Sequence, residues 1–287
     1  MITASEDLHQ LEIEKQAEKW KRLVRVYAGI LLAAYGISLL VCFICNLAVQ
    51  HTLSWFFVVL AAEAVAFSLT IVPVLLQKNR SLWTLGAFYG SLNLLLIVCR
   101  VLYGGNWLAI AFLSVALGFA VAFLPFVFRQ ISLPRALSSR KALLCFCIDT
   151  LLLFLLVSVS VWQRGNAAVL LETAYPLTLY GILLPWLYLL VIRYLRINPF
   201  FRAAICAGST GVYLFLLDSV LHTLLDGVRF ALPAVNLGEW GADMPNGNYL
   251  FLILAACLGL AFLFVVGGVI WSLTHREGRG QGGTRCA

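Results

Sequence analysis

Eight long apolar runs constrain most strongly what this 287-residue chain can fold into. Each run holds about 20 residues or more, the length that an α-helix needs to cross a hydrocarbon core of about 30 Å. Such runs form helices, because the bilayer core offers no water to satisfy free backbone groups. The runs occupy residues 25–49, 53–76, 82–103, 107–128, 142–162, 174–195, 202–225 and 248–273. We therefore predict an all-α fold, a polytopic membrane helix bundle of about eight transmembrane helices.

The composition supports an integral membrane protein and argues against direct nucleic-acid binding. Hydrophobic residues make up 62% of the chain and charged residues 11%, with a mean hydropathy of +0.95. A soluble domain is usually about 45–50% apolar and about 25% charged. The formal charge of +7 lies mostly in short connectors between apolar runs, where it is typical of membrane topology rather than of a nucleic-acid surface. We therefore expect the lipid bilayer to be the main partner.

The positive charges predict the orientation of the chain in a cell (plasma) membrane. With a cytoplasmic N-terminus, only Arg100, Arg164 and Arg229 among the 20 Lys and Arg residues fall outside the inner segments. Basic residues in short loops resist translocation, so this asymmetry sets the direction of insertion. We therefore predict a multi-pass protein with both termini in the cytoplasm.

Two short segments flank the predicted eight-span domain of residues 25–273. Residues 1–24 carry a loose apolar stripe among mixed charges, which predicts a cytoplasmic amphipathic helix leading into the first span. This helix is either a solvated stub or a docking site for a cytoplasmic protein partner. Residues 274–287 are Gly-rich and basic, which predicts a disordered cytoplasmic tail. The sequence makes no prediction of the oligomeric state.

Several ionisable residues interrupt the apolar runs. Asp149 lies toward the predicted cytoplasmic side, whereas Glu63, Arg100, Asp218 and His222 fall within the predicted outer half of the membrane. A charge at the bilayer centre costs at least about 2.5–3.5 kcal/mol, so each such group needs a partner, an interface or a cavity. We therefore predict an outer-half polar cluster of these four residues, with the Arg100 guanidinium between the two acids. The cluster is either a structural contact between helices or a ligand- or proton-responsive site.

The stretch YLFLLDSVLHTLLDG places Asp218, His222 and Asp226 at four-residue intervals, so they share one stripe of a helix. Because the ordinary pKa of histidine is near 6.5, His222 is the group most suited to make the protein pH-sensitive. The long connector 226–248 follows this stripe. Its apolar residues, among them Phe230, Leu232 and Trp240, predict a half-buried outer cap over the stripe.

The cysteines and histidines give no clear chemical motif. Cys42 and Cys45 form a CxxC pair one helical turn apart, which suggests quinone-linked thiol oxidation, but apolar packing is the favoured interpretation. The four His residues are dispersed, and no HExxH, P-loop or GxSxG motif occurs. We therefore predict no metal site, no cofactor and no catalytic residues.

Five stretches carry a resemblance to a known family: ICNLAVQHTLSWFFVVLAAEAVAFSLT, LLQKNRSLWTL, YGGNW, LPFVF and KALLCFCIDTLLLFLL. Together they resemble an uncharacterised multi-spanning membrane module of Firmicutes-type bacteria over residues 25–273. In that family the module often follows a helix-turn-helix DNA-binding domain or a small zinc ribbon. Here about 24 residues precede the first span, so neither domain is expected, and DNA binding does not carry over.

Two functions from different classes are compatible with these features. The resemblance favours a non-enzymatic sensory or regulatory membrane module that couples an outer-face signal to a cytoplasmic partner. The alternative is a small-solute transporter or permease, which predicts helices broken near mid-membrane. Sequence evidence for such breaks is thin, since only Pro185 with Gly181 could interrupt a span centrally.

Overall fold

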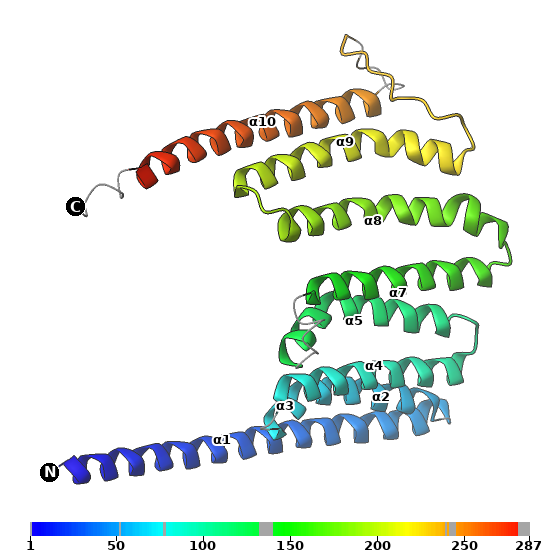
Figure 1. Cartoon of the computed structure of the whole chain (residues 1–287). Coiled ribbons are helices and arrows are strands. Elements are labelled where there is room, and N and C mark those ends of the chain that lie inside the picture. Colours follow the sequence, from blue (N-terminus) through cyan, green and yellow to red (C-terminus); the bar gives the residue numbers. More distant parts are fainter. Residues whose placement is uncertain are drawn as a thin grey trace. The chain divides into compact units, whose positions relative to one another are not determined.

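The computed structural model describes residues 2–51, 53–76, 79–131, 140–238, 240 and 245–280 (Figure 1). The described residues form helices and connectors without strands, so the predicted all-α class is confirmed. The chain divides into two compact units, Met1–Leu152 and Leu153–Ala287. We call them unit 1 and unit 2 and describe each by itself.

Unit 1 begins with one long helix. Helix α1 runs without interruption from Ile2 to Cys45, which corresponds to about 66 Å at 1.5 Å per residue. No Pro or Gly occurs between residues 5 and 28, so nothing interrupts the backbone hydrogen bonds there. The helix ends in a wide π-turn, η1 (Asn46–Gln50), and then in His51, which adopts a left-handed backbone with φ 52°. The prediction that residues 1–24 continue into the first span as a helix is therefore confirmed for residues 2–24.

The next helices of unit 1 pack through hydroxyl and aromatic contacts. Helix α2 (Ser54–Thr70) lies against α1 and against α4 (Arg80–Tyr103), as Figure 1 shows. It ends at Thr70 because Pro73, in the short α3 (Val72–Leu75), lacks the N–H that an α-helix requires. Helix α5 (Leu108–Gln130) then packs on α4, where the rings of Tyr89 and Phe119 lie 4.9 Å apart. Helix α7 (Lys141–Gln163) begins in unit 1 and continues into unit 2.

The described residues of unit 2 form the end of α7 and three further helices. Helix α8 (Tyr175–Leu189) is flanked by π-turns η2 (Leu170–Ala174) and η3 (Leu190–Tyr194). Helix α9 (Pro199–Leu225) is capped by the preceding Asn198, whose side chain accepts a hydrogen bond from the backbone N–H of Phe200. Helix α10 (Pro245–Gly280) runs along α9 (Figure 1). Small residues make this contact close, since a Cβ on Gly211 would lie 2.7 Å from Cys257 Cβ.

Eight helical segments of the described chain are long and apolar enough to cross a membrane. They agree with the eight predicted spans to within a few residues, except that the first begins seven residues earlier. Large apolar side chains such as Val101, Leu151 and Phe262 are about 70% exposed, which suits contact with lipid. The segments are Glu18–Val49, Ser54–Leu75, Arg80–Tyr103, Leu108–Gln130, Lys141–Gln163, Leu170–Tyr194, Pro199–Leu225 and Gly247–Thr274. The chain is thus a multi-pass membrane protein.

Two predictions about irregular segments require correction. Helix α10 extends through Gly280, so residues 274–280 are helical rather than disordered, and residues 281–287 lie outside the described chain. The reason is cooperativity, because an existing helix gains one hydrogen bond for each residue that it adds. The second correction concerns α8, which continues through Pro185 instead of breaking there. The departures from α-helical winding occur at its two ends, in η2 and η3.

Candidate functional site

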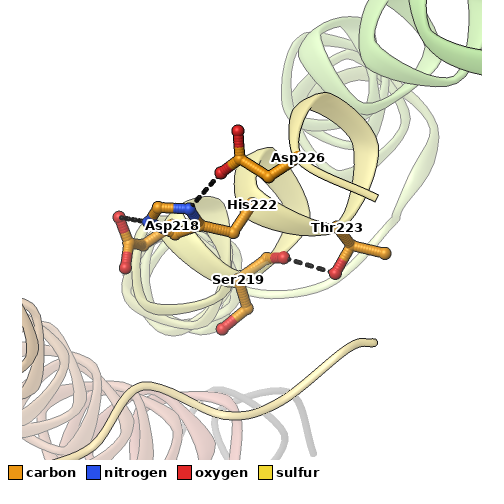
Figure 2. Close-up of polar contacts among 5 residues, drawn as sticks. All are labelled: Asp218, Ser219, His222, Thr223 and Asp226. Atoms are coloured by element: carbon orange, nitrogen blue, oxygen red, sulfur yellow. Dashed lines mark hydrogen bonds and ion pairs between the residues drawn. The ribbon is translucent and has the colours of Figure 1, made fainter. Parts of the chain in front are cut away.

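The predicted stripe of α9 is present and internally bonded. His222 Nδ1 lies 2.6 Å from Asp226 Oδ2, in hydrogen-bond contact, and His222 Nε2 lies 3.8 Å from Asp218 Oδ1 (Figure 2). Asp226 directly follows α9, and its backbone N–H donates to the carbonyl of His222. The imidazole therefore sits between two carboxylates at the end of α9, and we call these three residues the acid–imidazole stripe.

The acid–imidazole stripe lies on an exposed face of α9. The side chains of His222, Asp226 and Asp218 are 63%, 55% and 34% exposed. Figure 2 shows Ser219 and Thr223 on another side of the same helix, where the Thr223 hydroxyl donates to the Ser219 carbonyl at 2.7 Å. Ser219 is buried. The small polar side chains Ser219 and Thr223 thus lie on the side of α9 that packs within unit 2, and the stripe lies on a side that no described residue covers.

Glu63 and Arg100 belong to unit 1, and the predicted ion pair between them is not formed among the described residues. Both carboxylate oxygens of Glu63 are buried and have no hydrogen-bond partner there. Arg100 instead extends toward the end of α4, where its Nη1 would lie 3.7 Å from a Cβ built on Gly104. A long cationic side chain gains hydration by extending toward a helix end, and this outweighs pairing with an acid deeper in the span. The association of either residue with Asp218 and His222 of unit 2 stays a prediction.

The connector after α9 is anchored on α10 through two asparagines. Asn248 is fully buried in the first turns of α10, and its Oδ1 accepts from the Asn236 N–H at 2.9 Å. The Asn248 side-chain amide donates in turn to the Asn236 carbonyl at 2.8 Å. This reciprocal pair satisfies both backbone groups of Asn236 and holds this part of the connector on α10.

The three predicted cap residues differ in what they contact. Phe230 lines an apolar groove between α8 and α9. Trp240 packs edge-on against Tyr249 of α10, with ring centroids 5.7 Å apart, and its indole N–H donates to the Leu237 carbonyl. Leu232 is 64% exposed. Phe230 and Trp240 therefore contact α8, α9 and α10 but are 54% and 52% exposed, and the contacts described for them do not involve the acid–imidazole stripe.

An apolar groove along α8 and α9 was not predicted from the sequence. Two adjoining cavities of about 430 and 400 Å³ share Tyr180 and Leu183. Tyr180 stacks on Tyr213 of α9, with centroids 4.5 Å apart and ring planes at 13°, and its hydroxyl donates to the Tyr213 carbonyl at 2.6 Å. Gly208 and Ser209 leave the space open beside this stack. The small size of these two residues is the one feature of the sequence that points to the groove. Small residues are also common wherever two helices pack closely, so this feature is not specific.

The remaining candidate sites give no further chemistry in the described chain. No group of three or more His, Cys, Asp or Glu residues that could hold a metal ion occurs among the described residues. Comparisons with family models, curated proteins and solved structures gave no match.

Proposed function

We propose that this chain is a non-enzymatic sensory or regulatory protein of the cell membrane, with both termini in the cytoplasm. It couples a signal at its outer face to a cytoplasmic protein partner that binds residues 1–24. The observation that carries this proposal is the continuity of α1, which joins the N-terminal segment to the first span as one helix from Ile2 to Cys45. A displacement of the first span therefore moves the N-terminal segment with it, because no hinge lies between them.

Apolar side chains are exposed where this segment enters the first candidate span, Glu18–Val49. Trp20 and Leu23 are 69% and 63% exposed, and they lie three residues apart on one face of α1. Exposed Trp and Leu side chains on a helix commonly mark a protein interface. At the other side of the membrane, the acid–imidazole stripe offers titratable groups to a signal.

A pair of matched double variants tests the docking role of α1. Replacing Trp20 and Leu23 with Ser should abolish co-purification of the cytoplasmic partner after chemical cross-linking, because the apolar contact area is lost. Replacing Glu18 and Arg22 with Ser is the control, since both are exposed polar residues of the same helix, and it should leave the partner bound. Deleting residues 1–20 should also abolish binding of the partner, while the spans still insert in the membrane. If the shortened chain did not insert, residues 1–20 would have a structural role instead.

Reporter fusions test the proposed topology. The positively charged connectors should stay in the cytoplasm. A reporter protein that is active only in the cytoplasm should therefore be active when it is fused to one of them. Fusions after Leu76, Phe128, Leu195 and Leu273 should report a cytoplasmic location, and those after His51, Asn106 and Gly238 an external one. One reversed site would contradict the scheme.

A small-solute transporter is the competing proposal. It requires a path that opens to each side in turn, usually at helices interrupted near mid-membrane. Helix α8 does not supply that interruption, since it continues through Pro185. Substrate-dependent flux in proteoliposomes made from the full chain would overturn the sensory proposal.

A further inference from the structure

The apolar groove along α8 and α9 has a lining that favours a hydrocarbon ligand. Its two adjoining cavities, of about 430 and 400 Å³, are lined mostly by Leu, Val and aromatic side chains. Four lining residues carry a hydroxyl group, and those of Tyr180, Ser209 and Thr223 donate to backbone carbonyls of α9. The fourth is Tyr213. An apolar chain therefore fills the groove without leaving these three donors unpaired.

The groove lies within membrane-spanning segments of unit 2. Every described lining residue except Phe230 belongs to the sixth, seventh or eighth candidate span. Along α9 the lining runs from Gly208 to Leu224, which corresponds to about 24 Å at 1.5 Å per residue. One leaflet contributes about 15 Å, half of the hydrocarbon core. Acyl chains of the bilayer therefore surround the groove, and one extended chain fits along it.

Three arginines lie where α8 and α9 are joined. Only residues 195–198 separate the two candidate spans, so the connection lies at the membrane surface, at the level of the lipid headgroups. Arg193, Arg196 and Arg202 fall within ten residues of the chain there, and Arg193 and Arg196 are exposed. We call these three residues the cationic turn. No Asp or Glu occurs between residues 173 and 217, so neither helix supplies an acidic side chain near it.

Arg202 holds the cationic turn together. Its Nε donates to the carbonyl of Ile197 and its Nη1 to the carbonyl of Ile192, both at 3.0 Å. Ile192 belongs to η3, whereas Arg202 lies in the first turn of α9, so the guanidinium bridges the two ends of the connection. A guanidinium has five N–H donors, and those not used here are suited to the oxygens of a phosphate group.

The cationic turn and the groove share one face of α9. Arg202, Ser209, Leu216 and Thr223 follow each other at seven-residue intervals, which is close to two helical turns each. Ser209 and Leu216 line one cavity of the groove, and Thr223 lines the other. Arg202 therefore lies at the end of the same stripe, about 10 Å along the helix from Ser209. A ligand in the groove can thus have its polar end at the cationic turn.

We propose that the groove holds an acyl chain of an anionic phospholipid whose phosphate group binds at the cationic turn. The negative headgroup complements three arginines that have no nearby acid on α8 or α9. Membrane topology alone accounts for basic residues in a connector, but it does not require an apolar groove on the same face of α9. This inference goes beyond the proposed function and does not depend on it, because binding is measured without a signal or a cytoplasmic partner.

Photo-cross-linking of the full-length wild-type chain tests the site directly. The probe is phosphatidylglycerol with a diazirine in one acyl chain, added to the chain in dodecyl maltoside micelles. Peptide mapping should place the cross-links at groove-lining residues such as Leu183, Val212 and Leu216. Unlabelled phosphatidylglycerol should compete at least about 10-fold better than phosphatidylcholine with the same acyl chains, because its headgroup carries a net negative charge.

Matched double variants test the cationic turn. Arg193→Gln with Arg196→Gln should weaken phosphatidylglycerol binding about 30-fold, because each lost charge weakens binding about fivefold. Arg202 is kept in this variant, since it also holds the connection together. Arg164→Gln with Arg229→Gln is the control, because these exposed arginines lie in the connectors at the opposite ends of α8 and α9. It should leave binding unchanged.

A second pair of variants tests the groove. Leu183 lines both cavities and is 56% exposed, so Leu183→Trp places a larger side chain in the groove without entering the core. The cross-links at Val212 and Leu216 should then be lost. Leu263→Trp is the control, since Leu263 of α10 is 66% exposed and lines neither cavity. It should keep these cross-links.

Three results would overturn the inference. The first is cross-linking spread over exposed residues of α10, such as Leu263, instead of the groove. The second is equal competition by phosphatidylcholine, which would refute the role of the cationic turn. The third is competition by glycerol 3-phosphate as strong as that by phosphatidylglycerol, which would identify the ligand as a soluble phosphate. Because mapping and competition use the wild-type chain, these results decide the matter even if a variant fails to fold.

Discussion

Replacing Gly211 with leucine should force α9 and α10 apart and lower the free energy of unfolding by about 3 kcal/mol. A Cβ at this position would lie 2.7 Å from Cys257 Cβ and 3.5 Å from the Cα of Leu254. The Cβ of Cys257 is bonded directly to the backbone of α10, so rotation of its side chain cannot make room. Leucine adds three further carbons beyond Cβ, and the two helices must then separate along their contact. We expect a clearly lower Tm in detergent.

Gly181→Leu is the matched control for this prediction. Gly181 also lies inside a helix, but no atom lies within 4 Å of a Cβ built on it. Both substitutions gain about 1 kcal/mol of helix propensity, because glycine is a poor helix former. The control should therefore keep or raise the Tm. Equal Tm changes in the two variants would mean that α9 and α10 do not pack at Gly211.

The eight spans could be predicted because they depend on a local property of the sequence. A run of about 20 apolar residues has no stable alternative to a helix in lipid, whatever its neighbours are. The same reasoning predicted the continuity of α1, since it required only the lack of Pro and Gly. It also predicted the acid–imidazole stripe, because four-residue spacing within one helix decides which side chains meet.

Contacts between helices could not be predicted in this way. Depth in the membrane suggested that Arg100 meets Glu63, but depth does not determine the direction of a long side chain, and Arg100 extends toward Gly104. The packing of α1 on α2 includes a hydrogen bond between Tyr35 and Thr70 and a ring contact between Phe43 and Phe56, and nothing in the two apolar runs indicates these pairings. Apolar runs carry little information on register, since nearly all their side chains are interchangeable in hydrophobicity.

The π-turns show a further limit of local reasoning. Pro185 was the expected place for an interruption of its span, because its ring removes a backbone donor. Yet α8 accommodates Pro185, and the winding changes at its two ends, in η2 and η3. Pro176, which also lacks a backbone donor, follows η2 by two residues, whereas η3 contains no proline that would mark it in the sequence.

Asn248→Leu should release the connector between α9 and α10 and speed amide hydrogen exchange at Asn236 about 30-fold, which corresponds to about 2 kcal/mol. Leucine has the same number and branching of side-chain heavy atoms but can neither accept from the Asn236 N–H nor donate to its carbonyl. Both backbone groups would then be left without the partners that the buried amide supplies. The adjacent Gly247 makes this contact possible, because a Cβ there would collide with the Ala234 carbonyl oxygen.

Two further variants separate the backbone bonds from the side chain of Asn236. Asn248→Asp keeps an acceptor for the Asn236 N–H but loses the donor to its carbonyl, so its exchange rate should lie between those of the wild type and Asn248→Leu. Asn236→Ala removes only the side-chain acceptor of the Gly238 N–H, at 3.2 Å, and leaves both bonds to Asn248 in place. Its exchange should change little. If Asn236→Ala accelerated exchange as much as Asn248→Leu, the reciprocal asparagine pair would not be what holds the connector on α10, and packing of Phe230 and Trp240 would have to do so instead.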